Sequence, residues 1–392
     1  MDKVKIGNST FIKNLNQSSI LRLINEYGPI SRKELSEKTD YSAATISNHV
    51  KTLIEEGFVI EKEKGISSGG RKPVYLSINP NKGYIIGVDI EVSKVKIVMF
   101  NLKLKVEKKI EFYIDPQKSP KEILEDIQAD IEAMMLQKSV REYDLLGIGI
   151  AVPGLVNKER NLLKFAPNLG WQEEDISGYF NQKFKVPIFI ENEANAAGIG
   201  EKEFYYDKNI NMVYVSINEG IGCGLIFNGK IYRGASGNAG EFGHIIIDSE
   251  SGRKCHCGNK GCWETLASEN YLFERYLKLT DQRLDNIDQV YKKIKNNPQK
   301  VQQLLDKVGE NIGIGLANII NSLSPELMII GGHILNIKDH LDQSIQKSIQ
   351  DKTLKLNYQK AKIKYSKLGE LATVYGLAKL IFNKNMIIKE SP

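Results

Sequence analysis

Apolar residues recur at helical spacing near the start of the chain and predict two short helices. Residues 16–27 carry one apolar stripe, which is typical of a helix, and the pair Gly28-Pro29 ends it. Ser31 and Glu34 then have the spacing of a capping box, in which each side chain bonds the backbone N–H of the other residue. The sequence therefore predicts a second helix that begins after Ser31 and ends near residue 40.

A third helix is predicted after Ser42, and its two faces differ in character. The inner face carries an apolar stripe of Ile46, Val50, Leu53 and Ile54. The outer face carries short and mostly polar residues, namely Ser42, Ala43, Thr45, Ser47, Asn48 and Lys51. A helix that reads bases must enter a major groove about 12 Å wide, and short hydrogen-bonding side chains meet that requirement. The pattern favours a DNA-reading helix over its alternative, a small helical bundle with a solvated face.

The next segment predicts a β-hairpin with a basic tip. Residues 58–64 and 73–78 have the pattern of strands, and three helices followed by a hairpin constitute a winged helix. At the tip, Gly69 and Gly70 have no side chains to block close approach, and Arg71 and Lys72 supply two positive charges. The negative potential of a DNA minor groove attracts such a group, whereas the alternative is a basic loop without a role. Residues 1–82 hold 13 Lys and Arg against 9 Asp and Glu, which is +4 of the total net charge of +6.

Strand patterns dominate the chain after residue 84 and occur in two similar series. The first series contains three strands, a helix and two continuous apolar strands, at 84–90, 94–100, 105–114, 120–137, 145–152 and 187–190. The second contains three strands and, after helices that reach residue 323, one more strand, at 211–218, 223–228, 243–247 and 326–330. Continuous apolar strands are typical of sheets buried on both faces. The sequence predicts an α/β protein with an amino-terminal domain at 1–80 and two α/β lobes flanking a cleft at 81–392.

Length and composition restrict the class of protein further. The 392 residues are 41% hydrophobic and 26% charged, which is typical of a soluble protein of two or three domains. The apolar run at 145–156 is too short to span a bilayer, and the first nine residues lack the apolar core of a secretory signal. We therefore expect a cytoplasmic protein without a membrane partner.

Several motifs in the two lobes resemble those of the ROK family, which contains repressors and sugar kinases. They are Glu191-Asn192-Glu193-Ala194-Asn195-Ala196, Glu241-Phe242-Gly243-His244 and Cys255-His256-Cys257-Gly258-Asn259-Lys260-Gly261-Cys262-Trp263-Glu264. With a winged helix in front of them, the chain most resembles the xylose repressor branch. The resemblance implies that residues 81–392 form a two-lobed fold of the actin and hexokinase type.

The cysteine motif indicates a zinc site. Three cysteines within eight positions suit a metal site in a reducing compartment better than disulfides. Together with an imidazole, they supply the three thiolates and one nitrogen that tetrahedral Zn2+ accepts, from His244, Cys255, Cys257 and Cys262. We expect a zinc knuckle at 244–264, with His256 directed elsewhere and Cys223 simply buried. The alternative is a loop of unliganded thiols.

The resemblance also implies a sugar site in the cleft. Positions that contact sugar in the family correspond to Gly154, Asn168, Asn192, Glu193, Glu241, His244 and Glu264. Carboxylates suit this task because each can accept two charge-assisted hydrogen bonds from hydroxyl groups. Glu193 stands where the family's kinases have a catalytic aspartate. Its extra methylene moves the carboxylate by about 1 Å or more, so sugar binding can survive while phosphoryl transfer is lost.

The two phosphate-binding turns of the family's kinases are altered in this chain. The first reads Asp89-Ile90-Glu91-Val92-Ser93 where the family has Asp-Ile-Gly-Gly-Thr, and the second reads Asn218-Glu219-Gly220 where it has Gly-Thr-Gly. Each turn gains bulk and a carboxylate. Two like charges about 4 Å apart repel by roughly 4 kcal/mol at an effective dielectric of about 20, so we expect ATP to be excluded.

The resemblance and the altered turns together predict a sugar-responsive transcriptional repressor and not an enzyme. The expected partners are a palindromic operator, bound by a homodimer, and a sugar that releases the DNA. The resemblance makes that sugar xylose. The alternative is an active ROK sugar kinase with an appended DNA-binding domain.

Overall fold

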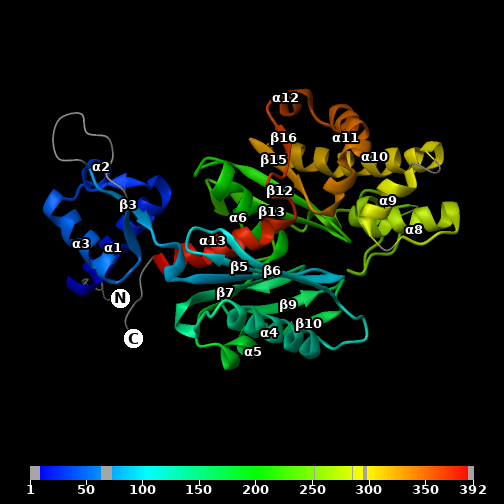
Figure 1. Cartoon of the computed structure of the whole chain (residues 1–392). Coiled ribbons are helices and arrows are strands. Elements are labelled where there is room, and N and C mark those ends of the chain that lie inside the picture. The colour runs from blue at the N-terminus through cyan, green and yellow to red at the C-terminus, as the bar shows by residue number, and fades with distance from the viewer. Residues whose placement is uncertain (1–8, 63–72, 251, 285, 295–297, 387–392) are drawn as a thin grey trace, which may run out of the picture.

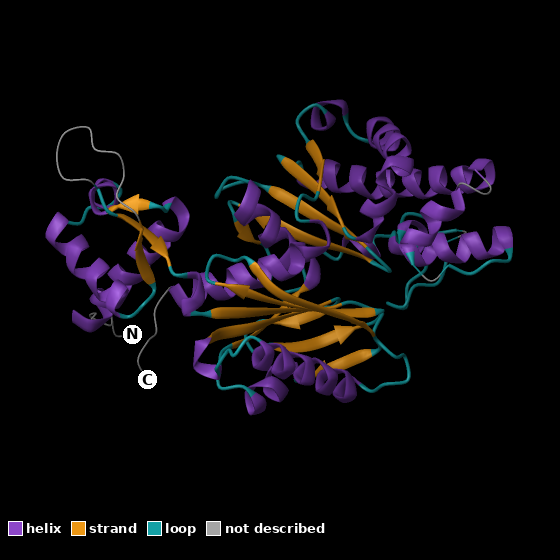
Figure 2. Cartoon of the chain, viewed as in Figure 1, coloured by secondary structure: helices purple, strands orange, loops and turns teal. Residues whose placement is uncertain are grey.

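The computed structural model describes residues 9–62, 73–250, 252–284, 286–294 and 298–386. An amino-terminal winged helix stands beside a body of two lobes, each with a five-stranded sheet (Figure 1). Helices cover the outer faces of the two sheets, and further helices lie between them (Figure 2). No helix within the described residues is long and apolar enough to cross a membrane. The predicted α/β class and the two similar lobes are confirmed.

In its described part, at 9–62 and from 73 on, the winged helix has three helices and a three-stranded sheet in the order β1-β3-β2. Its elements are α1 (Ser9–Tyr27), β1 (Ile30–Ser31), α2 (Arg32–Glu37), α3 (Ala43–Glu55), β2 (Val59–Lys62) and β3 (Tyr75–Ile78). The predicted capping box is present, since the Ser31 hydroxyl accepts from the Glu34 N–H and the Glu34 carboxylate accepts from the Ser31 N–H at 2.8 Å. The sequence pattern misses β1 because two residues are too few to show an alternation.

The first lobe is a sheet in the order β11-β7-β4-β5-β6. Its elements are β4 (Tyr84–Ile90), β5 (Lys94–Asn101), β6 (Val106–Tyr113), α4 (Pro120–Gln137), β7 (Leu145–Val152), α5 (Ile176–Lys183) and β11 (Ile188–Asn192). The bounds of β4, α4 and β7 are those predicted. Because β4, β7 and β11 run parallel, their carboxyl ends lie at one edge of the sheet.

A small antiparallel sheet inserted after β7 was not predicted from the sequence. It contains β8 (Leu155–Asn157), β9 (Leu162–Ala166) and β10 (Trp171–Glu174) in the order β10-β9-β8. Its strands are short, and turn residues separate them closely, so no periodic pattern marks them. The turn between β9 and β10 carries Asn168, one of the expected sugar contacts.

The second lobe repeats the topology of the first, in the order β14-β13-β12-β15-β16. Its strands are β12 (Met212–Ile217), β13 (Ile221–Phe227), β14 (Lys230–Ile231), β15 (Leu327–Gly331) and β16 (Lys362–Tyr365). In the first lobe β4 pairs antiparallel with β5 and parallel with β7. In the second lobe β12 likewise pairs antiparallel with β13 and parallel with β15. The repeated topology explains why the two series of sequence patterns look alike.

The strand predicted at 243–247 is wrong. Residues Phe242–His244 form a single 3-10 turn, and the apolar run after it leaves the sheet. Its backbone bonds go to the cysteine motif instead, because the Trp263 N–H donates to the Ile245 carbonyl and the Ile247 N–H donates to the Gly261 carbonyl. The apolar run therefore attaches the motif to the lobe.

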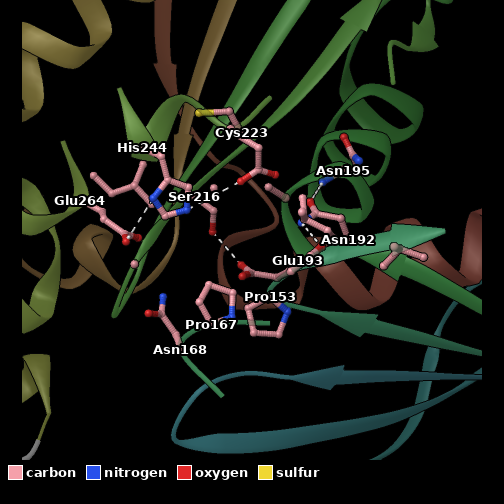
Figure 3. Close-up of a pocket in the computed structure, with 18 of the residues that line it drawn as sticks. Pro153, Pro167, Asn168, Asn192, Glu193, Asn195, Ser216, Cys223, His244 and Glu264 are labelled. Atoms are coloured by element: carbon pink, nitrogen blue, oxygen red, sulfur yellow. Dashed lines mark hydrogen bonds and ion pairs between the residues drawn. The ribbon is translucent and has the colours of Figure 1, made fainter. Parts of the chain in front are cut away.

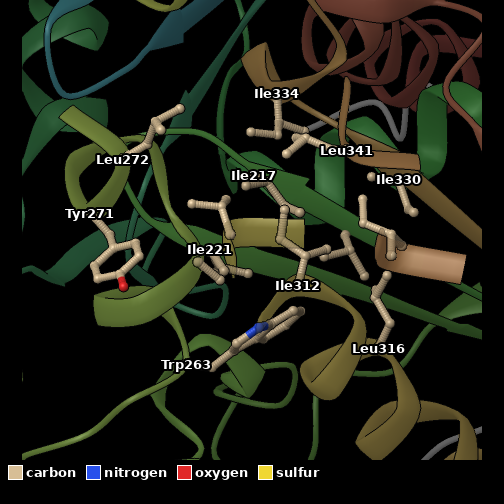
Figure 4. Packing of buried hydrophobic residues seen from close by; sticks show 14 of the residues in the cluster. Ile217, Ile221, Trp263, Tyr271, Leu272, Ile312, Leu316, Ile330, Ile334 and Leu341 are labelled. Atoms are coloured by element: carbon tan, nitrogen blue, oxygen red, sulfur yellow. The ribbon is translucent and has the colours of Figure 1, made fainter. Parts of the chain in front are cut away.

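Within the described residues, six helices complete the second lobe around a large apolar core (Figure 4). They are α7 (Glu264–Ala267), α8 (Glu269–Thr280), α9 (Ile287–Ile294), α10 (Pro298–Leu323), α11 (Lys338–Lys352) and α12 (Lys355–Tyr358). Trp263 lies in this core with 1% of its surface exposed, and its indole N–H donates to the Asn311 carbonyl at 2.8 Å. Gly315 of α10 leaves room for the ring, since a Cβ there would overlap it. Trp263 thus fixes the end of the cysteine motif on α10.

Two helices cross between the lobes, α6 (Glu193–Tyr205) and α13 (Ala372–Met386). They approach closely at Gly200 and Gly376, where an added Cβ would overlap the backbone of the opposite helix. Because both residues lack a side chain, the two helices can pack closely against each other where the lobes meet.

The winged helix contacts both lobes. Phe382 of α13 shares an apolar core with Ile20 of α1 and with Leu102 of the first lobe. On the other side, Glu26 of α1 pairs with Lys208 of the second lobe at 2.7 Å. A change in the angle between the lobes would therefore act on the winged helix.

Candidate functional site

A cavity of about 270 Å³ lies between the lobes, where β4, β7 and β11 end (Figure 3). Open α/β sheets bind ligands in crevices outside the carboxyl ends of their strands. All seven positions that the family resemblance assigns to sugar line this cavity: Gly154, Asn168, Asn192, Glu193, Glu241, His244 and Glu264. The fold thus brings together residues that the sequence distributes over several separate motifs.

The first lobe supplies two amide side chains. Asn192 caps α6 by accepting from the Asn195 N–H at 3.0 Å, and its amide nitrogen donates to the Gly154 carbonyl at 3.1 Å. A primary amide has two N–H donors, so one remains for a ligand. Asn168 reaches across the cleft, where its Oδ1 lies 2.9 Å from Nδ1 of His256. The prediction that His256 is directed away from the cysteines agrees with this contact.

The second lobe supplies two carboxylates and an imidazole on one wall. His244 Nε2 lies 3.8 Å from the Glu241 carboxylate, and His244 Nδ1 lies 3.5 Å from the Glu264 carboxylate. Burial raises the pKa of Glu241, an effect that the neighbouring His244 partly offsets. Glu264 is 8% exposed and accepts from the Cys255 thiol at 3.0 Å. This wall combines acceptors with a ring that can donate, as recognition of hydroxyl groups requires.

The four expected metal ligands form one group. One ligand atom from each of His244, Cys255, Cys257 and Cys262 lies within 4.8 Å of all the others. The Cys255 Sγ to His244 Nδ1 distance is 3.6 Å, and the Cys257 Sγ to Cys262 Sγ distance is 3.7 Å. Two thiolates on a tetrahedral ion with metal–sulfur bonds of about 2.3 Å lie roughly 3.8 Å apart. Both the donor set and the spacing therefore fit a closed tetrahedral metal site.

Glu193 is held by the second lobe. Its carboxylate accepts from the Ser216 hydroxyl at 2.7 Å and from the Asn218 amide at 3.0 Å. Burial raises the pKa of Glu193 to about 7, and the hydrogen bond from Ser216 offsets only part of that shift. A carboxyl group so enclosed is partly protonated near neutral pH.

In each of the two altered turns, the added carboxylate has partners within the protein. Glu91 is 4% exposed, with its carboxylate 3.1 Å from Lys96 Nζ and 3.0 Å from His333 Nε2. Burial alone would raise the pKa of Glu91, but the hydrogen bond from His333 and the charge of Lys96 lower it to about 2. Glu219 accepts from the Ser93 hydroxyl at 2.5 Å. The exclusion of ATP stays a prediction, and the structure adds that the carboxylates of both turns are already paired.

Sequence reasoning missed an ion pair that also lines the cavity. Glu191 is fully buried, and Arg233 holds it with two hydrogen bonds of 2.8 and 2.6 Å. Lys158 adds a third contact at 3.1 Å. Arg233 follows β14 in a loop without any pattern, so only the buried acid in the motif at 191–196 could have indicated that a cation was needed.

The predicted DNA-reading helix presents the expected face. Ile46, Val50 and Leu53 are buried, and the outward residues of α3 are exposed or half-exposed: Ser42, Ala43, Thr45, Ser47, Asn48 and Lys51. The Ser42 hydroxyl caps the helix by accepting from the Thr45 N–H at 3.2 Å. The tip residues Gly69, Gly70, Arg71 and Lys72 lie outside the described residues.

Comparison with known proteins identifies the family. The model of the ROK family matches residues 85–384. The chain belongs to the ROK family. A model described as winged helix-turn-helix DNA-binding matches residues 13–60 of this ROK protein. The xylose repressor of Bacillus subtilis (strain 168) is 37% identical to it over 384 residues, which cover 96% of this chain and 97% of that protein.

One solved structure matches nearly the whole chain, and another matches about three quarters of it. A ROK family transcriptional regulator, described as a homologue of the MLC protein of E. coli, matches with a TM-score of 0.79 at 26% identity, covering 96% of this chain and 98% of its own. A ROK family glucokinase from Streptomyces griseus, solved with glucose and AMPPNP, matches with a TM-score of 0.67 at 26% identity, covering 76% and 99%. This ROK protein is accordingly a DNA-binding transcriptional repressor rather than an enzyme.

Proposed function

We propose that this ROK protein represses a xylose-utilisation operon in the cytoplasm and that xylose releases it from the operator. The composition of the cavity carries the proposal. Six carboxylates line it against one guanidinium and one imidazole: Glu91, Glu191, Glu193, Glu219, Glu241 and Glu264 against Arg233 and His244. Hydroxyl groups donate to carboxylates, so this lining suits a neutral polyol. The volume of about 270 Å³ is near the lower limit of ligand pockets, as a monosaccharide needs.

The choice of xylose rests on the likeness to the B. subtilis repressor. Pentoses and hexoses offer the same kinds of hydroxyl group, so the lining of the cavity does not distinguish them. Binding calorimetry with a panel of aldoses tests the choice, and xylose is expected to bind most tightly.

Sugar can release DNA only if it binds the two conformations of the repressor unequally. A sugar held by Asn192 of the first lobe and by Glu241 and His244 of the second favours the closed cleft. Closure moves the winged helix because it is attached to the first lobe through residues 79–83 and contacts the second through Glu26. A hundredfold loss of operator affinity needs a coupling of only about 2.7 kcal/mol, which a few charge-assisted hydrogen bonds supply.

On DNA, the proposed active form is a homodimer bound to a palindromic operator. One winged helix reads a single half-site, and two related by a twofold axis read both. The outward side chains of α3 would enter the major groove, while the wing tip at 69–72 would enter the minor groove. Sedimentation of the free protein and of its operator complex tests the dimer.

The cysteine motif is proposed to bind one Zn2+ per chain through His244, Cys255, Cys257 and Cys262. The group fits a tetrahedral ion by its donor set and by its spacing. A bound zinc ion would supply a rigid attachment for His244, whose other nitrogen faces Glu241 in the cavity. The metal would thus hold one wall of the sugar pocket in place.

Glu264→Ala tests the proposed function. The variant should bind the operator as the wild type does, because Glu264 lies far from α3 in the fold, yet xylose should no longer release it. Fluorescence anisotropy of labelled operator with and without xylose measures both properties, with Glu159→Ala, an exposed carboxylate outside the cavity, as the matched control. Full release of Glu264→Ala by xylose would place the sugar elsewhere, and sugar-dependent formation of ADP by the wild type would support the kinase alternative.

A further inference from the structure

Two side-chain contacts join the lobes at the turns that hold phosphate in the family's kinases. Ser93, in the turn after β4, donates to Glu219, in the turn after β12, at 2.5 Å. Glu91 follows the same first-lobe strand and lies 3.0 Å from Nε2 of His333, which follows β15 of the second lobe. Glu91 and Glu219 are among the residues that line the cavity, whereas Ser93 and His333 are not among the described lining residues, and none of the four is among the seven positions assigned to sugar.

His333 is fixed firmly in the second lobe. Its Nδ1 lies 3.3 Å from the buried carboxylate of Glu269, and its backbone N–H donates to the side chain of Asn218 at 2.7 Å. Burial alone would lower the pKa of His333, but the carboxylates of Glu269 and Glu91 raise it to about 11. The imidazole is therefore positively charged and lies between one acid of each lobe.

Glu91 is fixed equally firmly in the first lobe. Lys96, with 1% of its surface exposed, lies 3.1 Å from Glu91, and its ammonium also donates to the Glu370 carbonyl at 2.8 Å. Buried charges persist only where they are paired, and here each member of the interlobe pair has a second partner of opposite charge in its own lobe, Lys96 for Glu91 and Glu269 for His333. The pair is thus preorganised on each side of the cleft.

We propose that Ser93, Glu219, Glu91 and His333 form an interlobe latch, which stabilises the closed cleft in place of a nucleotide and so sets the sugar concentration at which the repressor responds. In a kinase of this fold, phosphate groups occupy the two turns. In this chain the same turns reach each other through their own side chains. The inference rests on the proposed function in one respect, that sugar binds the closed cleft more tightly than the open one.

The direction of the effect follows from linkage. A ligand that binds a fractionally populated conformation has its apparent affinity reduced by that fraction. Loss of the latch lowers the population of the closed cleft, so sugar must supply more of the free energy of closure. Hydrogen bonds to charged groups each shift an equilibrium by roughly ten- to a hundredfold. Removing one latch contact should therefore weaken xylose binding by about tenfold or more, without abolishing release at saturating xylose.

The experiment compares Ser93→Ala and His333→Gln with Lys94→Ala as a matched control. Lys94 lies 3.6 Å from the Glu91 carboxylate but belongs to the same lobe, so its removal changes the local charge and leaves the interlobe contacts intact. Calorimetry gives the xylose affinity, and small-angle X-ray scattering without sugar gives the radius of gyration. We expect weaker xylose binding and a larger radius for both latch variants, and wild-type values for Lys94→Ala.

Wild-type xylose affinity and wild-type scattering in both latch variants would overturn the proposal. Ser93→Ala removes only one hydroxyl group, so it remains a test even if His333→Gln misfolds. Scattering also separates the latch from the proposed function. If the wild type fails to bind xylose, the proposed function is wrong. The latch is then judged by scattering alone: a larger radius of gyration of sugar-free Ser93→Ala would support it, and a wild-type radius would overturn it.

Discussion

Substitution of Gly315 by alanine should destabilise the second lobe, although alanine is the better helix former. In a helix interior, glycine to alanine gains up to about 1 kcal/mol. At this position, however, the new Cβ would overlap the indole ring of Trp263. Overpacking of a core costs about 1–3 kcal/mol, and displacement of the ring also loses the hydrogen bond to Asn311, worth about 1 kcal/mol. The clash therefore exceeds the gain in helix propensity, and the expected net loss is about 2 kcal/mol.

Thermal unfolding followed by circular dichroism measures this loss. A change of about 2 kcal/mol in a unit of this size lowers the Tm by roughly 4–8 °C. A double-mutant cycle with Trp263→Phe identifies the cause, because the smaller ring makes room for the Cβ, and the two substitutions together should cost at least about 1 kcal/mol less than their sum. An unchanged or raised Tm for Gly315→Ala, or strict additivity in the cycle, would refute the close packing described for this helix.

Three further predictions concern the wing tip, the metal and the ion pair between the winged helix and the second lobe. Arg71→Ala with Lys72→Ala should weaken operator binding and flatten its salt dependence by a slope of about 0.9 per lost phosphate contact, as measured by anisotropy at several salt concentrations, without changing sugar affinity. Cys257→Ser should lose both zinc, by elemental analysis, and most of the sugar affinity; full affinity in the metal-free variant would show that the two are independent. Lys208→Glu places like charges opposite Glu26, so it should alter operator release by xylose while leaving xylose affinity within about twofold, and the reciprocal Glu26→Lys exchange in the same chain should restore the response.

Much of the fold was predictable because local patterns and tertiary structure agree. The capping box of Ser31 and Glu34, the buried strands at 84–90 and 145–152 and the helix at 120–137 carry strong signals of spacing or continuous apolarity. The prediction failed where apolar residues serve another purpose. The run that includes Ile245 and Ile247 resembles a strand, yet its backbone pairs with the cysteine motif, and nothing in three or four residues distinguishes these cases.

The site was predictable only where motifs mark it. Glu241, His244 and Glu264 belong to recognisable segments, and all of them line the cavity. Arg233 stands in a loop and His333 begins a short 3-10 helix, and neither belongs to a recognisable motif. Their pairing with Glu191 and Glu91 depends on how the two lobes face each other. A tertiary arrangement of this kind leaves no periodic trace in the sequence.

The helix α13 has a consequence for how the protein is made. It contributes Val374 to the same apolar core as Ile24 of α1, although the two residues lie 350 positions apart in the chain. During synthesis the ribosome therefore delivers the amino-terminal helices long before the segment that covers them, and domains begin to fold as they emerge. A messenger cut short, or a protease acting near residue 372, would leave the DNA-binding end with an exposed apolar surface. Loss of α13 should thus first affect the amino-terminal DNA-binding domain, and it should be detected as aggregation or as loss of repression.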